Sequence, residues 1–133
     1  MSMSNTIEKN LEQEVPTVDL VSQISQKIEF EMLVKKSYLK KGYSLRDLSR
    51  DANIHIYLLS AFINKKKGLR FNDFINQYRV DSCKELMKEG SALLVTLEAL
   101  ASMCGFGNRN TFISAFKKFT GVTPSEYIRS ISS

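Results

Sequence analysis

Basic side chains are the residues of this sequence whose number and placement suggest a chemical role. The chain of 133 residues has 19 Lys and Arg against 14 Asp and Glu, a net charge of +5. Residues 1–34 carry two Lys and six acids, a net −4, whereas the remainder carries 17 bases and 8 acids, a net +9. A basic body of this kind is typical of a protein that binds a polyanion, most often nucleic acid, although many basic domains bind none.

Catalysis and metal binding are disfavoured by the residue types present. The sequence has no recognisable carboxylate pair, nucleophile with a base, glycine-rich phosphate loop or metal cluster, so we expect no enzyme and no cofactor. A single His leaves too few ligands for zinc. Cys83 and Cys104 are 21 residues apart without a CxxC motif, and we expect two small buried thiols rather than a disulfide or a metal pair.

Targeting signals are also missing from the printed sequence. It contains no run of 18 apolar residues, which disfavours a membrane span and membrane contact. Residues 1–10 lack the basic and apolar regions of a secretory signal. We therefore expect a cytoplasmic protein.

The first part of the chain divides into a leader and a helix. Residues 1 to about 22 are polar and aperiodic, and we expect residues 1–25 to form a flexible leader or linker. A helical stripe of apolar residues follows, which predicts a helix that ends near Gly42. The stripe consists of Ile24, Ile28, Met32, Leu33 and Leu39. Lysines near its end suit the helix dipole, which gives them a structural explanation: Lys35, Lys36, Lys40 and Lys41.

Helix starts and ends are marked along the rest of the sequence. Residues that suit helix starts are Ser44 with Asp47, Thr96, and Thr123 followed by Pro124 and Glu126. Residues that tolerate a left-handed turn or end a helix are Asn53, Gly68, Gly90, Gly105 and Gly121. The helices predicted between them run from about His55 to Lys66, from about Phe71 to Lys88, and from Asn108 to Phe119. No stretch has the pattern of a strand, so we predict an all-α fold.

One helical element occurs twice in the chain. Leu45, Leu48, Ser49, Asn53 and Ile54 match Leu97, Leu100, Ala101, Gly105 and Phe106, each 52 residues later. Leu59, Ile63 and Gly68 match Phe112, Phe116 and Gly121, each 53 later. Each half has a small residue where two helices cross, then a turn former, then an apolar anchor, as in a helix-turn-helix. A duplicated hairpin that serves only packing is the alternative.

The spacing between the two elements suits DNA. A helix from Phe71 to Lys88 would be about 27 Å long at ~1.5 Å per residue. Successive major-groove faces of B-DNA lie about 34 Å apart. One chain could therefore place two recognition helices in adjacent grooves, in the way that a dimer does, and we expect a monomer on DNA.

Two stretches of the sequence identify a family. "GFGNRNTFISAFKKFTGVTPSEYI" at 105–128 and "YLLSAFINKKKGLRFNDFINQYRVDSCKELM" at 57–87 closely resemble the DNA-binding domain of AraC/XylS-family bacterial transcription regulators. The resemblance covers roughly residues 28–129. It implies about seven helices in two helix-turn-helix subdomains, about 28–70 and 92–130, joined by a linker helix at 71–88, in a domain spanning 26–130. The segment 71–79 resembles a variant seen when this domain follows a sensor region.

The resemblance also implies which residues face the bases. The first recognition helix would present His55, Ile56, Tyr57, Ser60, Ala61 and Asn64, and the second Asn108, Arg109, Asn110, Ile113, Ser114 and Lys117. Many members have Arg where this chain has Ala61 and Ser114. Arg109 and Asn110 are the best remaining readers, because Arg suits guanine and Asn suits adenine. Two alternatives remain: Asn110 bonds its own backbone at the helix start, and Tyr57 packs on its own helix. For His55 we expect a DNA-facing or capping residue rather than a switch.

Phosphate contacts are expected from cations and from helix starts. The candidate cations are Lys65, Lys66, Lys67 and Arg70 after the first recognition helix, and Lys117 and Lys118 late in the second. Backbone N–H groups near Ser44, Thr96 and Asn108 would add anion sites. The alternative is that these lysines only solvate an exposed face. For Arg79 the resemblance suggests a structural ion pair in the linker helix.

The sequence therefore predicts a sequence-specific transcription regulator that reads two adjacent major grooves of promoter DNA and works with RNA polymerase. The alternative is a protein-interaction module that contacts RNA polymerase or an antagonist and binds DNA weakly, as a fragment of a larger sensor-regulator. A leader of about 25 residues cannot form an effector-binding domain. The sequence is thus either a stand-alone regulator or part of a longer one, membrane-tethered or not.

Overall fold

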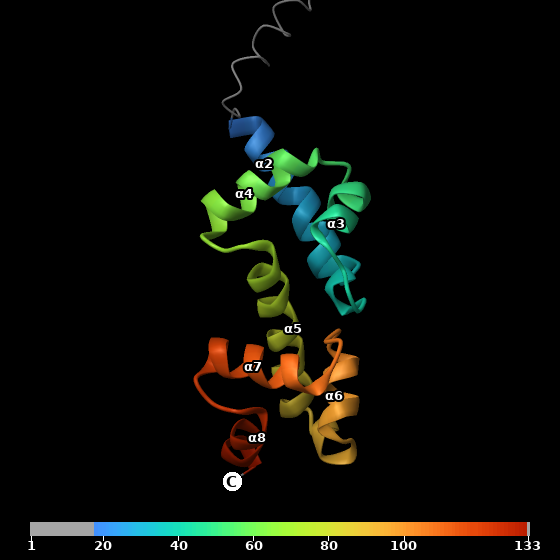
Figure 1. Ribbon diagram of the computed structural model, residues 1–133, viewed down its shortest axis with the longest axis vertical. Helices are drawn as coiled ribbons and strands as arrows, with labels where there is room; N and C mark the ends of the chain where they lie inside the picture. Colours follow the sequence, from blue (N-terminus) through green and yellow to red (C-terminus); the bar gives the residue numbers. More distant parts are fainter. Residues whose placement is uncertain (1–17, 133) are drawn as a thin grey trace, which may run out of the picture.

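The computed structural model describes residues 18–132, which form seven α-helices, a π-helical turn and two 3-10 turns, without a strand in that range (Figure 1). The α-helices are α2 (Val18–Glu29), α3 (Leu45–Ala52), α4 (Ile56–Lys67), α5 (Phe71–Lys88), α6 (Leu97–Met103), α7 (Arg109–Thr120) and α8 (Pro124–Ser132). The short turns are η1 (Phe30–Val34, the π-helical turn), η2 (Ser37–Leu39) and η3 (Ser91–Leu94). The all-α prediction is confirmed.

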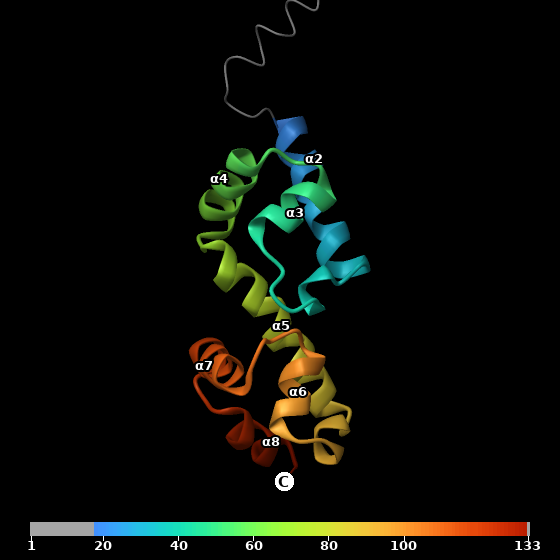
Figure 2. The same cartoon turned by 45° about the vertical axis from the view of Figure 1, so that its right-hand side comes forward.

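The helices form two lobes along the long axis of the molecule, with α5 running from one into the other (Figures 1 and 2). The first lobe contains α2, α3 and α4, and the second contains α6, α7 and α8. Each lobe has its own core, and α5 contributes Phe74 and Ile75 to the first but Val80, Cys83 and Met87 to the second. The single apolar stripe of α5 therefore serves both cores in turn.

Aromatic rings dominate the second core. Phe106, Phe112 and Phe116 are all fully buried, with successive ring centroids 5.3 and 5.9 Å apart. Tyr127 of α8 lies edge-on to Phe116 at 5.5 Å. Truncating a buried Phe to Ala typically costs about 3–5 kcal/mol, so these rings account for much of the stability of the lobe.

Three of the predicted helix starts are capped as expected. At α3 the N–H of Ser44 donates to the Asp47 carboxylate at 2.9 Å, and the N–H of Asp47 donates to Ser44 Oγ at 3.1 Å. The same reciprocal pair closes the start of α8, between Thr123 and Glu126, at 2.8 and 3.1 Å. Thr96 Oγ1 accepts the N–H of Ala99 at 3.0 Å at the start of α6.

The repeat is a structural one. In the first lobe the N–H of Ile54 donates to the carbonyl of Ser49 at 3.0 Å, across a turn at Asn53 with φ +56°. In the second, the equivalent N–H of Phe106 donates to Ala101 at 2.9 Å. Both anchors, Ile54 and Phe106, are buried. The two turns therefore have the same hydrogen bond at matched positions.

The start of the chain differs from the prediction. Residues 1–17 lie outside the described part, but 18–25, expected to belong to the leader, form the first turns of α2, where Ile24 is buried and Leu20 and Val21 pack against the core. The helix expected to continue to Gly42 ends at Val34. Lys36 then takes a left-handed conformation with φ +52°.

The π-helical turn explains the early end. The N–H of Lys35 reaches back five residues to the carbonyl of Phe30 at 3.0 Å, which widens the turn. Glu31 thereby faces inward, where its carboxylate accepts from Ser37 Oγ at 3.0 Å and from Lys35 Nζ at 3.3 Å. Leu33, expected in the buried stripe, is instead 61% exposed.

The two cysteines are free and buried, as predicted. A hydrogen bond with Cys104, together with burial, raises the pKa of the Cys83 thiol far above its ordinary value. Thiols of this kind are unreactive, because the thiolate is the nucleophilic form. Separately, none of the helices within residues 18–132 combines the length and the apolar character that crossing a bilayer would need.

Candidate nucleic-acid interface

The two predicted recognition helices, α4 and α7, lie on the same side of α5 in both views (Figures 1 and 2). Each begins after the tight turn of its helix-turn-helix unit, at Asn53 and at Gly105. Each ends at a glycine in a left-handed conformation, Gly68 and Gly121. The fold therefore presents both helices on one face of the molecule.

In the first lobe, most candidate base readers are exposed. Tyr57 is 79% exposed, and His55, Ala61 and Asn64 are exposed as well, whereas Ile56 and Ser60 are half-buried. His55 caps α4, because its Nδ1 accepts the N–H of Tyr57 at 3.3 Å. The ring of Tyr57 stacks on that of His55, with centroids 5.5 Å apart. In this arrangement His55 caps α4 and Tyr57 packs on the ring of His55, while both side chains stay exposed.

In the second lobe, Asn108, Arg109, Asn110, Ser114 and Lys117 are exposed, whereas Ile113 is half-buried against the core. The Oδ1 of Asn108 accepts the N–H of Thr111 at 2.8 Å, so Asn108 rather than Asn110 caps α7. This removes the reason for assigning Asn110 a backbone role. Asn110 stands in the first turn of α7 with an exposed side chain.

Two candidate DNA-binding cations have acidic partners. The Nζ of Lys118 donates to both carboxylate oxygens of Asp73 in α5, at 3.0 and 2.9 Å. Arg109 Nε lies 3.9 Å from a carboxylate oxygen of Glu98 in α6, a longer and solvent-exposed pair. Neither partner is apparent from the sequence, because each lies on a different helix from the cation.

The remaining candidate phosphate-binding groups differ in whether they are exposed or already hydrogen-bonded within the protein. The candidate cations in the last turn of α4, after α4 and late in α7 are all exposed: Lys65, Lys66, Lys67, Arg70 and Lys117. The three lysines were expected after the first recognition helix but belong to its last turn. At the three helix starts, the side chains of Ser44, Thr96 and Asn108 each accept the N–H three residues on. Those N–H groups are thus already bonded, which leaves the other first-turn N–H groups to meet an anion.

Within residues 18–132, Arg79 makes hydrogen bonds to neutral groups instead of the ion pair that was expected. Its Nε donates to the carbonyl oxygen of Tyr38 at 2.7 Å, and its Nη2 to that of Lys40 at 3.1 Å. Its Nη1 donates to Asn76 Oδ1 at 3.2 Å. Backbone carbonyls of the first lobe therefore replace the predicted carboxylate. Sequence reasoning missed them because a carbonyl oxygen leaves no trace in residue type.

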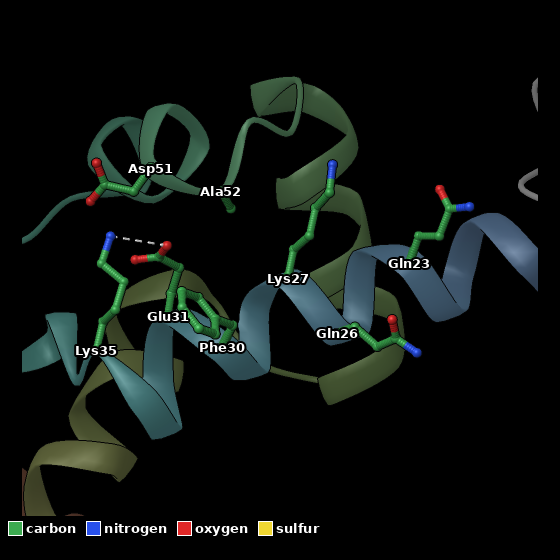
Figure 3. A pocket seen from close by; sticks show the side chains of 8 residues that line it. All are labelled: Gln23, Gln26, Lys27, Phe30, Glu31, Lys35, Asp51 and Ala52. Carbon is green, nitrogen blue, oxygen red and sulfur yellow. Dashed lines mark hydrogen bonds and ion pairs between the residues drawn. The ribbon is translucent and has the colours of Figure 1, made fainter.

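One hollow of the described part of the chain lies away from the recognition helices. It is an open groove of about 470 Å³ between α3 and the helix formed by α2 and η1 (Figure 3). The ion pair of Glu31 and Lys35 lies at one end, and Gln23 lies toward the other. A smaller hollow of about 190 Å³ lies between α5 and α7 and includes Asp73, Ser114 and Lys118.

Comparison with known proteins finds similarity to helix-turn-helix transcription regulators. A family model described as a helix-turn-helix domain matches residues 48–130, more than half of the chain. The probable transcriptional regulator LumQ of Photobacterium leiognathi is 26% identical over 92 residues, which are 69% of this chain and 36% of LumQ. The HTH-type transcriptional activator RhaR of Escherichia coli is 28% identical over 89 residues, 67% of this chain and 30% of RhaR. The chain thus spans about a third of the length of these relatives.

Solved structures share the fold. The C-terminal domain of AraT, a response regulator from Geobacillus stearothermophilus, has a TM-score of 0.67 at 21% identity, over 81% of this chain and 84% of that domain. The C-terminal domain of the two-component response regulator yesN from Fusobacterium nucleatum has a TM-score of 0.63 at 27% identity, over 78% of this chain and 98% of that domain. The first likeness concerns the fold alone.

Proposed function

The chain belongs to the AraC/XylS family of helix-turn-helix transcription regulators, and from this premise we propose that it binds promoter DNA sequence-specifically, with α4 and α7 in two adjacent major grooves. The observation that carries the proposal is the position of these two helices on one side of α5, with exposed polar and basic side chains (Figures 1 and 2). A rigid α5 of about 27 Å suits the distance between successive grooves.

Base reading is assigned mainly to the start of α7. Arg109 and Asn110 are exposed in the first turn, where side chains of a recognition helix enter the groove. Arg suits guanine O6 and N7, and Asn suits adenine N6 and N7. In the first lobe His55, Tyr57 and Asn64 are the exposed polar candidates. The ring of Tyr57, stacked on that of His55, offers an apolar face to thymine methyls.

Phosphate binding is assigned to the cations at the helix ends. Lys65, Lys66 and Lys67 close α4, where the helix leaves the groove toward the backbone. Such contacts hold the protein on any duplex and make binding salt-dependent. We propose that one monomer occupies one asymmetric site of about 20 bp, two helical turns, in the cytoplasm of a bacterium, with RNA polymerase as a further partner and no catalytic activity.

A second candidate function is a protein-interaction module with weak DNA binding. It is favoured by Ala61 and Ser114, which stand where the family resemblance leads us to expect Arg, and by the acidic partners of Arg109 and Lys118. Both features reduce the positive charge offered to DNA. In this case the chain would act as part of a larger sensor-regulator.

A competition mobility shift separates the two functions. A duplex is first selected from a random pool for binding to the chain, and the complex is then challenged with excess unrelated DNA. Specific reading predicts that the selected complex survives the challenge, and sedimentation should give one chain per duplex. Loss of the complex at the same competitor concentration as an unselected duplex would support the interaction module, and an obligate dimer on a palindrome would contradict monomeric binding.

A further inference from the structure

A joint between the two lobes lies beside the middle of α5. The segment 36–40, which includes η2, crosses α5 there, and the ring of Tyr38 stacks on that of Tyr78 at 5.6 Å between centroids. The turn between α6 and α7 approaches the same segment from the second lobe (Figures 1 and 2). The lobes therefore meet directly as well as through the linker helix.

Arg79 is the side chain that contacts all three parts of the joint. It belongs to α5, and its Nε and Nη2 donate to the carbonyls of Tyr38 and Lys40 in the first lobe, at 2.7 and 3.1 Å. Its guanidinium carbon lies 5.8 Å from the ring centroid of Phe106 in the second lobe. A planar guanidinium holds its donors in a fixed fork, so two carbonyl oxygens and a ring face define its orientation closely.

Gly105 brings the second lobe against the same carbonyl. A Cβ on Gly105 would collide with the carbonyl oxygen of Tyr38, and it would lie 2.9 Å from Leu39 Cα and 3.0 Å from Arg79 Nε. Asn53 occupies the equivalent turn position of the first lobe with φ +56°, so the turn itself accepts a side chain. Glycine at the second turn is thus required by the approach of the other lobe, in addition to its φ of +93°.

We propose that Arg79 and Gly105 fix the angle and distance between α4 and α7, so that this joint, together with α5, selects the spacing of the two half-sites in DNA. The joint lies to one side of the α5 axis, so its contacts resist twisting and bending of α5. Without these contacts, the relative position of the two lobes would depend on α5 alone. A tethered second head binds at an effective concentration that is highest when the tether matches the span. The consequence for DNA rests on the proposed two-groove reading.

The first test measures the joint in the free protein. Spin labels are placed on Lys67→Cys at the end of α4 and on Ser125→Cys in α8, both exposed, while the native thiols are buried. Arg79→Met should broaden the distribution of label distances, and Arg79→Lys should give an intermediate width, because a lysine cannot serve both carbonyls through a planar fork. Lys88→Met removes an exposed cation from the same helix and should leave the distribution narrow.

The second test measures spacing on DNA. The probes are a selected duplex and versions lengthened or shortened by two base pairs between the half-sites, which turns one half-site by about 70° around the DNA axis. The wild-type chain should prefer its own spacing by about a hundredfold, and Arg79→Met should reduce this preference to about threefold while keeping the affinity for a single half-site. Lys88→Met should behave as wild type.

The outcomes separate the joint from the two-groove proposal. If the wild-type chain does not distinguish the spacings, two-groove reading fails, whereas the label distances still decide whether the joint orders the lobes. If wild type and Arg79→Met distinguish the DNA spacings equally, and the label distances of Arg79→Met stay narrow, the proposed role of the joint is overturned. If circular dichroism shows that Arg79→Met does not fold, both the label distances and the spacing preference are measured on Arg79→Lys instead. An Arg79→Lys variant that behaves as wild type in both measurements would overturn the proposal.

Discussion

Lys118 in α7 donates to both carboxylate oxygens of Asp73 in α5, at 3.0 and 2.9 Å, across 45 residues of sequence. The two side chains are 59% and 30% exposed, so the pair contributes at most about 1 kcal/mol to folding. Its larger effect concerns DNA. A lysine whose charge is already balanced by a carboxylate attracts a DNA phosphate less strongly. The carboxylate of Asp73 also repels a phosphate directly.

Asp73→Asn should therefore strengthen binding to every duplex. Freed Lys118 becomes available to a phosphate, so the slope of log affinity against log salt should steepen by about one counterion. Titrations at several salt concentrations on selected and unrelated duplexes measure both effects. Glu85→Gln removes an exposed carboxylate farther along the same helix and serves as the control. Weaker binding by Asp73→Asn would mean that the pair holds α7 in its reading position.

Arg109→Ala should instead change which sequence is bound. Arg109 stands in the first turn of α7, so its loss should cost about 1–3 kcal/mol on the selected duplex and relax the choice at one base pair. Lys66→Ala, at the end of α4, should weaken binding similarly on all sequences and flatten the salt dependence by about one counterion. Titration on single-substituted duplexes distinguishes the two. An equal loss on every duplex for Arg109→Ala would identify a phosphate contact, and specificity would then come from Asn110, Tyr57 or DNA shape.

Features that depend on local sequence were predictable. α5 begins and ends where its apolar stripe and Gly90 placed it, and the caps at Ser44, Thr96 and Thr123 follow from side chains that bond their own helix starts. The duplicated turn was visible because its small residue, turn former and anchor recur at fixed offsets. Periodicity and capping act over one or two turns, which is the range that a single sequence displays.

Features that depend on distant or backbone partners were not predictable. Lys36 has a left-handed backbone conformation, which a sequence usually marks with glycine. Glu31 can be buried because Ser37 and Lys35 donate hydrogen bonds to its carboxylate. Apolar periodicity continued through both positions and suggested one long helix. The partner of Arg79 was sought among carboxylates, yet carbonyl oxygens are present at every residue and cannot be chosen from sequence.

Acid should destabilise two helix starts. Backbone and side-chain hydrogen bonds from Ser44 lower the pKa of Asp47 below its ordinary 3.8, and those from Thr123 lower the pKa of Glu126 below 4.5. A carboxyl whose folded pKa is depressed stabilises the fold above its unfolded pKa, and this contribution is lost as pH falls through the folded value. The loss should therefore begin below about pH 4.5 and continue below 3.8.

A variant that combines Asp47→Asn and Glu126→Gln tests whether these two carboxylates stabilise the fold. The variant should unfold at a lower temperature than wild type near neutral pH, and the difference should shrink in acid, where the wild-type carboxyls are protonated as well. Thermal unfolding followed by circular dichroism across the acid range measures the two curves. Curves that stay parallel throughout would show that neither carboxyl contributes through its charge.

A one-residue insertion in α5 tests whether the lobes act as one unit. Insertion after Ser82 turns the following helix by about 100° and lengthens it by about 1.5 Å. An insertion after Ser82 would separate Val80 from the rest of the second core, to which it belongs. An insertion directly after Arg79 avoids this, because Ile75 stays with the first core, and Val80 and Cys83 stay with the second. Both insertions should keep the helical content by circular dichroism. The insertion after Arg79 should reduce affinity for the selected duplex to that of a single half-site, since the second head no longer faces its groove. Unchanged affinity would show that the heads bind independently or that one of them does not read DNA.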